Sequence, residues 1–260
     1  KQSDFWRVPP DTFPDDRWTN SIALVFEPRG AKGLYLGMGR VFMAYQRNTP
    51  ITVGGLATLF QSVRKQSLST RDNPRGKDSR DQMISPWFRW VFPDVGFETY
   101  GEFGKSDHNW NWRDVILEPD HARAYVLGIN KLFRLRNGIL ETRFEVTNLA
   151  SPRTAGLRGA GFWYHHSRIQ QGYTENGQVV GAGIGTGSDQ QAFNVEWFAP
   201  FGRAGVFLKR HRSDSDSFYR AYQDPDGGQI FLHDVRLGLG ARAVVFAGPL
   251  QLELSYERQQ

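Results

Sequence analysis

A period of two in the chain's hydropathy is the feature that most constrains its fold. In 250–258, Leu252, Leu254 and Tyr256 fall on one face of an extended chain, and Glu253 and Glu257 fall on the other. This alternation is the mark of a β-strand with one apolar face. The same pattern predicts ten strands, near 21–28, 33–46, 83–93, 96–104, 121–135, 139–149, 190–199, 203–213, 230–246 and 250–258.

The connections between these strands alternate between short and long. Short turns lie near 28–32, 93–95, 136–138, 201–202 and 247–249, and Asn137-Gly138 is a strong hairpin signal. Long, Gly- and Asp-rich segments lie at 47–82, 105–120, 150–189 and 214–229. Tight turns at one edge and long loops at the other are typical of an outer-membrane barrel. A large soluble antiparallel barrel is the alternative.

Composition excludes several other classes. There is no cysteine for a disulfide framework or a thiolate metal site, and 14% of residues are aromatic, which argues against disorder. The charge of +5 comes from interspersed basic and acidic residues, so we expect no nucleic-acid partner. We therefore expect an all-β fold, an antiparallel transmembrane β-barrel with about 10–12 strands present.

One helix is expected within the loops. Leu56, Leu59, Phe60 and Val63 have the spacing of one apolar helical face, which predicts a short loop helix packed on the barrel rim or acting as a lid.

The strand directions bear on domain organisation. If the short turns face the periplasm, strand 250–258 ends at the exterior, whereas bacterial barrels usually keep both ends in the periplasm. We interpret 1–260 as a single β-barrel domain, part of a larger barrel, incomplete at the N-terminus and lacking a strand after Gln260. A complete barrel with an unusual terminus is the alternative.

Charged residues on the polar faces of the strands suggest a lumen with a mixed-sign ladder. Glu98 and Glu102 share a face but are about 13 Å apart along the strand, too far for glycosidase chemistry. The candidates for lining the lumen are Arg89, Glu98, Glu102, Arg123, Glu141, Arg143, Glu145, Arg236, Arg242 and Glu253.

Aromatic and polar residues in the long loops suit carbohydrate, because rings stack on sugars and polar groups bond hydroxyls. The alternative is that these rings only pack the loops together. The Asp and His residues of 105–125 lack metal-ligand spacing, so we expect no metal, no cofactor and no catalytic residue. The candidates for carbohydrate binding are Trp110, Trp112, Arg113, Asp114, Trp163, Tyr164 and Tyr173.

Four stretches together resemble the capsule-assembly Wzi family: 81–93 (DQMISPWFRWVFP), 96–104 (GFETYGEFG), 118–125 (EPDHARAY) and 171–185 (QGYTENGQVVGAGIG). The resemblance extends from about residue 20 to 258. It implies an outer-membrane barrel of about eighteen strands that holds capsular polysaccharide at the cell surface as a lectin, not an enzyme.

The expected function is therefore a non-catalytic barrel of the bacterial outer membrane. We expect it to bind or anchor surface polysaccharide. Its other partners would be outer-membrane lipid and further envelope proteins. Two alternatives are a scaffolding barrel within a larger envelope assembly and a pore for small solutes.

Overall fold

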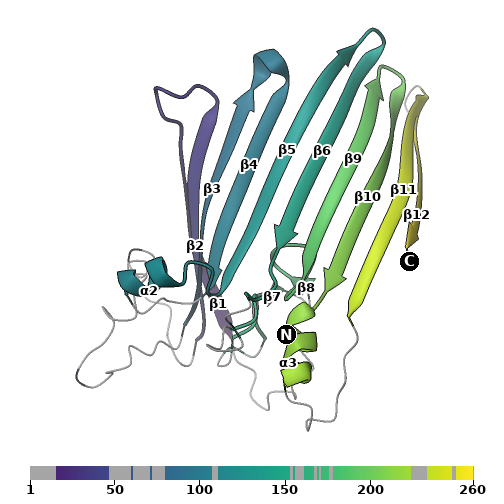
Figure 1. Ribbon diagram of the computed structural model, residues 1–260. Helices are drawn as coiled ribbons and strands as arrows, with labels where there is room; N and C mark the ends of the chain where they lie inside the picture. The colour runs from purple at the N-terminus through teal and green to yellow at the C-terminus, as the bar shows by residue number, and fades with distance from the viewer. Residues whose placement is uncertain are drawn as a thin grey trace.

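The computed structural model describes residues 16–46, 60, 71, 80–106, 111–152, 155, 161–166, 169, 171–175, 178–223, 233–247 and 250–259. Ten long strands form one antiparallel sheet, in the order β1-β2-β3-β4-β5-β6-β9-β10-β11-β12 (Figure 1). Their bounds are β1 Arg17–Phe26, β2 Leu34–Tyr45, β3 Asp81–Phe92, β4 Phe97–Ser106, β5 Arg123–Leu135, β6 Gly138–Asn148, β9 Asp189–Ala199, β10 Gly202–Ser213, β11 Asp234–Ala247 and β12 Leu250–Gln259.

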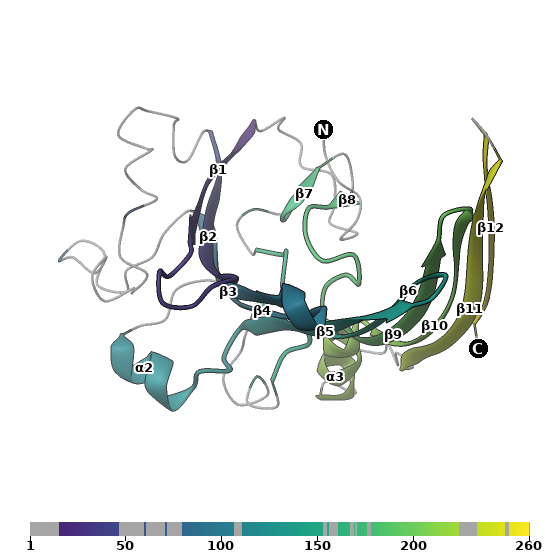
Figure 2. The same cartoon turned by 90° about the horizontal axis from the view of Figure 1, so that it is seen from above.

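All ten strands that the alternation predicts are present, and each pairs with the next long strand along the chain. The sheet is all-β and antiparallel, but it is not closed. In the described part of the chain, β1 and β12 are its two edges. Figure 2 shows the sheet as an open arc, so we refer below to its concave and convex faces.

The two ends of the strands differ as expected. Short connections join β1 to β2, β3 to β4, β5 to β6, β9 to β10 and β11 to β12, at what we call the turn edge (Figure 1). The connection after β3 contains the 3-10 helix η4 (Pro93–Val95). The hairpin predicted at Asn137-Gly138 is confirmed, and Gly138 has a φ of 152°. A Cβ at Gly138 would lie 2.1 Å from the carbonyl oxygen of Phe198, so only glycine fits this close approach.

The long connections lie at the opposite end, which we call the loop edge. They contain α2 (Trp112–Leu117), α3 (Ser215–Gln223) and a small hairpin of β7 (Thr174–Glu175) and β8 (Gln178–Val179). Figure 2 shows the β7–β8 hairpin on the concave side and the two helices on the convex side. The loop helix predicted over 56–63 falls almost wholly outside the described residues, which include only Phe60 of that segment.

The convex face is apolar and exposed. Leu127, Leu208 and Leu239 are 52%, 53% and 61% exposed, although they sit in the middle of the sheet. In the register they continue across strands, since Phe193 pairs with Leu208 and Leu208 pairs with Leu239. No second layer covers these rows in the described structure. No helix of the described residues is long and apolar enough to cross a membrane.

The concave face is polar and internally bonded. Arg89 donates two hydrogen bonds to Glu98, both at 2.9 Å, and Arg242 donates two to Glu196 at 3.0 and 2.8 Å. The first pair joins the neighbouring strands β3 and β4, and the second joins β11 to β9 across β10. Such bidentate pairs satisfy the charges without an apolar core. Polar side chains therefore face the inside of the arc, and apolar side chains face outward.

Candidate functional site

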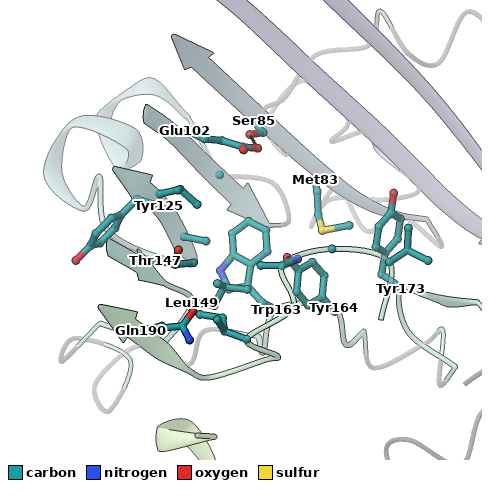
Figure 3. A pocket seen from close by; sticks show the side chains of 18 of the residues that line it. Met83, Ser85, Glu102, Tyr125, Thr147, Leu149, Trp163, Tyr164, Tyr173 and Gln190 are labelled. Carbon is teal, nitrogen blue, oxygen red and sulfur yellow. Dashed lines mark hydrogen bonds between the residues drawn. The ribbon is translucent and has the colours of Figure 1, made fainter. Parts of the chain in front are cut away.

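A cavity of about 730 Å³ lies on the concave face near the loop edge. Strands β2 to β6, β9 and β10 form one side, and the loop between β6 and β9 forms the other. Figure 3 shows Trp163 and Tyr164 of this loop close to Met83 of β3, Thr147 of β6 and Leu149, which directly follows β6. We call this space the concave cavity.

Two buried rings of the loop form the apolar side of the concave cavity. Trp163 and Tyr164 are 6% and 8% exposed, and their rings meet edge to face at 5.9 Å. Trp163 packs against strand positions without large side chains, because a Cβ at Gly104 would be 2.7 Å from its ring. Tyr164 in turn stacks on Tyr173 at 6.2 Å. These contacts seat the loop against the sheet through aromatic packing.

Hydrogen bonds fix the same loop. The indole N–H of Trp163 donates to the carbonyl of Arg123 at 2.9 Å. Thr186 donates to the Trp163 carbonyl at 2.6 Å. Arg17 of the edge strand β1 donates to the carbonyls of Gly172 and Thr174. The bonds from Trp163 and Arg17 therefore join the loop to β5 and to β1, and the Thr186 bond links two parts of the loop itself.

Polar groups from the strands complete the concave cavity. Ser85 donates to the carboxylate of Glu102, and both line the cavity with Thr147 and Gln190 (Figure 3). His211 of β10 also lines it, and its Nε2 lies 3.2 Å from the carbonyl of Ile184. Hydroxyl, amide and carboxylate groups opposite aromatic rings are the combination that binds sugars.

Burial changes the protonation behaviour of the loop residues. It raises the pKa of Tyr164 and of Tyr173, so both phenols stay neutral and can donate or accept hydrogen bonds. Burial also lowers the pKa of His165, and the nearby positive charge of Arg220 acts in the same direction. The described loop residues that line the concave cavity, such as Tyr164, Tyr173 and Ile184, are therefore uncharged.

The structure divides the predicted carbohydrate-binding residues into two groups. Trp163, Tyr164 and Tyr173 come together at the concave cavity. Trp112 and Arg113 lie on α2, where both are exposed, on the convex side (Figure 2). Asp114 belongs to the same helix, and Trp110 lies outside the described residues. The predicted aromatic set is thus not one continuous platform.

Most of the predicted lumen residues share the concave face. In addition to the Arg89–Glu98 pair, Glu141 accepts bonds from Asn130 and Arg143, both at 2.7 Å. The residues whose strand parity places them on this face are Arg89, Glu98, Glu102, Glu141, Arg143, Glu145, Arg236, Arg242 and Glu253.

Arg123 is the exception, and its predicted position was wrong. It has the same parity in β5 as the exposed Leu127, so it lies on the convex face. Its guanidinium lies 5.1 Å from the ring centre of Tyr125, and it donates to Asn148 at 2.9 Å. The adjacent Ala124 faces inward and packs against Trp163, which fixes Arg123 on the other side.

Sequence reasoning missed several residues of the concave cavity, including Ser85, Thr147, Gln190 and His211. Ser85 could have been found from the alternation of faces along the strands, starting from Glu102. Ser85 is two residues before Trp87, the register partner of Glu102, so it belongs to the same face. The loop residues that close the cavity could not be found this way, because no period relates them to the strands.

The described residues form an antiparallel sheet with an apolar convex face, a polar concave face and long loops at one end, and the sheet is open at β1 and β12. Outer-membrane barrels share this amphipathic pattern. The comparisons with known proteins agree at the level of family. The capsule assembly protein Wzi family matches residues 7–259, nearly the whole chain. The chain belongs to this family, and its membership suggests a capsule-related function at the outer membrane. No curated protein and no solved structure matches the chain.

Proposed function

We propose that this chain forms a wall of an outer-membrane β-barrel and binds or anchors surface polysaccharide at the concave cavity, without catalysis. The observation that carries the proposal is the opposite polarity of the two faces. Apolar side chains on the convex face, such as Leu239 at 61% exposure, suit contact with lipid. The hydrogen-bonded charges of the concave face suit contact with water and a hydrated ligand.

The chemistry of the concave cavity supports a sugar rather than an apolar ligand. Its wall combines the carboxylate of Glu102, the amide of Gln190 and the hydroxyl of Thr147 with the rings of Trp163 and Tyr164. A pyranose ring needs both kinds of group, since it has an apolar face and a rim of hydroxyls. The family's link to capsule adds surface polysaccharide as the source of that ring.

A binding experiment tests this function. Purified protein in detergent micelles is titrated with capsular polysaccharide, and binding is measured for the wild type and for Glu102→Gln combined with Gln190→Ala. Replacing the charged acceptor of Glu102 by a neutral amide and removing the amide of Gln190 should together weaken binding by about tenfold or more. The matched control is Glu253→Gln, on the same face but near the turn edge. Equal binding by all three proteins would refute the cavity as the polysaccharide site.

The non-catalytic role has its own readout. Incubation of the polysaccharide with the protein should release no reducing sugar above a protein-free control. Release that Glu102→Gln abolishes would show a hydrolase instead.

A second candidate is a structural wall within a larger envelope assembly. It is favoured by the two open edges, β1 and β12, whose outer backbone groups have no strand partner in the described residues. Unpaired strand edges are costly in lipid, so another strand must cover them there. Cross-linking of cysteines introduced at Ala23 and Leu252 to neighbouring proteins in intact cells would identify such an assembly. A pore has less support, because the loop with β7 and β8 occupies the concave side (Figure 2).

A further inference from the structure

The apolar band of the convex face ends abruptly near the loop edge. On β5, alternate residues from Leu127 to Leu135 include five that face outward, and all but Lys131 are apolar. Toward the loop edge the outward positions become polar on four neighbouring strands. They are Arg123 on β5, Asn148 on β6, Asp189 and Gln191 on β9, and Arg210 and Arg212 on β10.

The length of the band matches hydrocarbon. The eight steps from Leu127 to Leu135 span about 26 Å along the strand, or about 20 Å along the membrane normal for a tilt near 40°. Outer-membrane barrels have an outward apolar band of about 25 Å. The polar positions therefore lie at the level where lipid headgroups begin.

We call Arg123, Arg210 and Arg212 the arginine row. Asp189 is its one carboxylate, so the row with Asp189 has a net charge of +2. Arg210 Nη1 lies 2.9 Å from Asp189 Oδ1, and Arg212 Nε donates to the other carboxylate oxygen. Arg123 bonds only a neutral amide, that of Asn148. The positive charge is thus incompletely neutralised at a place that would contact lipid.

The geometry of the arginine row leaves donors for another acceptor. A guanidinium has five N–H groups in a planar fork. Among the described residues, the hydrogen bonds of Arg123, Arg210 and Arg212 use one nitrogen of each guanidinium. The Arg210 and Arg212 side chains remain 40% and 25% exposed. Asp189 is itself nearly buried, so it orients the two guanidiniums rather than competing for an outside ligand.

Exposed aromatic residues accompany the arginine row. Helix α3 follows β10 directly, and its Tyr219 and Tyr222 are 51% and 77% exposed. Trp112 of α2, on the same side of the sheet in Figure 2, is 58% exposed. Tyr and Trp concentrate at the boundary between hydrocarbon and headgroups, because their rings are amphipathic. Positive charge and exposed aromatic residues therefore both occur at the loop edge on the convex side (Figures 1 and 2).

We propose that the arginine row binds the phosphate groups of lipid headgroups in the outer leaflet. This inference rests on the proposed function, because it needs the convex face to lie in a membrane. Guanidinium forks fit phosphate oxygens in a bidentate manner and form charge-assisted hydrogen bonds with them. From β5 to β10 the row crosses three strand spacings, about 14 Å, enough to hold a headgroup that carries more than one phosphate.

Variants must avoid leaving Asp189 buried without a partner, which would destabilise the fold. The first variant is Arg123→Gln, which removes the bond to Asn148 and the contact with the Tyr125 ring and leaves Asp189 paired. The second combines Asp189→Asn, Arg210→Gln and Arg212→Gln, and so removes the acid together with its two bases. The matched control is Arg89→Gln with Glu98→Gln, a neutralised pair on the concave face.

The measurement is native mass spectrometry of the detergent-purified chain titrated with phosphorylated lipid A, with dephosphorylated lipid A and with inorganic phosphate. We expect tight binding of the phosphorylated lipid alone. The triple variant should bind it at least about tenfold more weakly, and the concave control should bind it like the wild type. Equal binding by the triple variant and the control would overturn the proposal, and so would binding of inorganic phosphate as tight as that of the lipid.

The failure of the proposed function would look different. A chain that does not insert into lipid would show no heat-dependent shift of its folded band in gel electrophoresis. A chain that shows the shift, yet binds lipid A regardless of its phosphates, refutes only the headgroup site.

Discussion

Substituting one valine of the convex face by arginine should be costly, and the cost should depend on its depth. Val206 of β10 is 54% exposed and lies between Val195 and Ala241 in the register. It is four residues from Arg210, about 13 Å along the strand or about 10 Å in depth at a 40° tilt. This places it near the middle of the apolar band.

The expected cost follows from that depth. Arginine on the lipid face of an outer-membrane barrel costs about 2–4 kcal/mol at the midplane and about 0–1 kcal/mol near the interface. Val206→Arg should therefore lower the free energy of unfolding by about 3 kcal/mol. If the convex face were in water, the same change at an exposed site would cost within about 0.5 kcal/mol.

Val235→Arg is the matched control. Val235 faces the same way on β11, is 41% exposed, and pairs with Arg212 of the arginine row. The identical substitution there should cost less than about 1 kcal/mol. The assay is urea unfolding of protein folded into lipid vesicles, followed by tryptophan fluorescence. If Val206→Arg and Val235→Arg lowered the free energy of unfolding by the same amount, whether large or small, the assignment of the convex face to lipid would be refuted.

Three further changes probe the concave side. Trp163→Ala should lower the free energy of unfolding, measured with urea, by about 3–5 kcal/mol, because it removes a buried ring and an indole hydrogen bond. A loss of less than about 1 kcal/mol would show that Trp163 does not anchor the loop. Gly128→Ala should reduce folding yield in vesicles, because its Cβ would lie 2.1 Å from the ring of Tyr100, and Gly128→Ala with Tyr100→Ala should restore it. Burial lowers the pKa of His165 from 6.5, so below about pH 6.5 the unfolded chain gains a proton that the folded chain does not, and the free energy of unfolding falls as pH falls. His165→Gln should reduce the difference in unfolding free energy between pH 7.5 and pH 5.5. An unchanged difference would contradict this assignment.

The strands were predictable because the alternation of apolar and polar residues identifies both where a strand lies and which of its side chains share a face. A half-apolar strand must alternate, so Leu252 and Leu254 identify β12 and its convex face from sequence. The polar partners follow by parity, which is why Glu98 and Glu141 were placed on the concave face. The pairing partners themselves, such as Arg242 with Glu196 two strands away, depend on curvature and side-chain reach that no period encodes.

The prediction for Arg123 was wrong for a related reason. A charged residue in a strand was assigned to the lumen by its type, whereas its parity with Leu127 places it outward. At the end of an apolar band the outward positions become polar, so the polarity of a residue there no longer predicts which face of the sheet it lies on. Parity counted from the middle of the strand is the more reliable guide.

Helix α3 also escaped prediction, although its sequence carries signals. Asp214 accepts a hydrogen bond from the backbone N–H of Ser217 at 3.3 Å, as a capping residue does, and Phe218 stacks on Tyr222 one turn later at 6.3 Å. Both features are short-range and lie in a polar loop, where they compete with turn signals. The β7–β8 hairpin is only two residues per strand, too short for any period to show.

The placement of the covering loop bears most directly on what surrounds this sheet. In a soluble sheet protein, a layer of the chain covers the apolar face and leaves the polar face in water. Here the loop that carries Trp163 packs on the polar, concave face, and the described chain leaves the apolar rows around Leu208 and Leu239 exposed. An exposed apolar surface of this extent requires a partner that is itself apolar. Because the rows run across the sheet and end at the arginine row, a continuous medium with a polar boundary fits them better than a second protein layer, and the two valine substitutions measure that boundary directly.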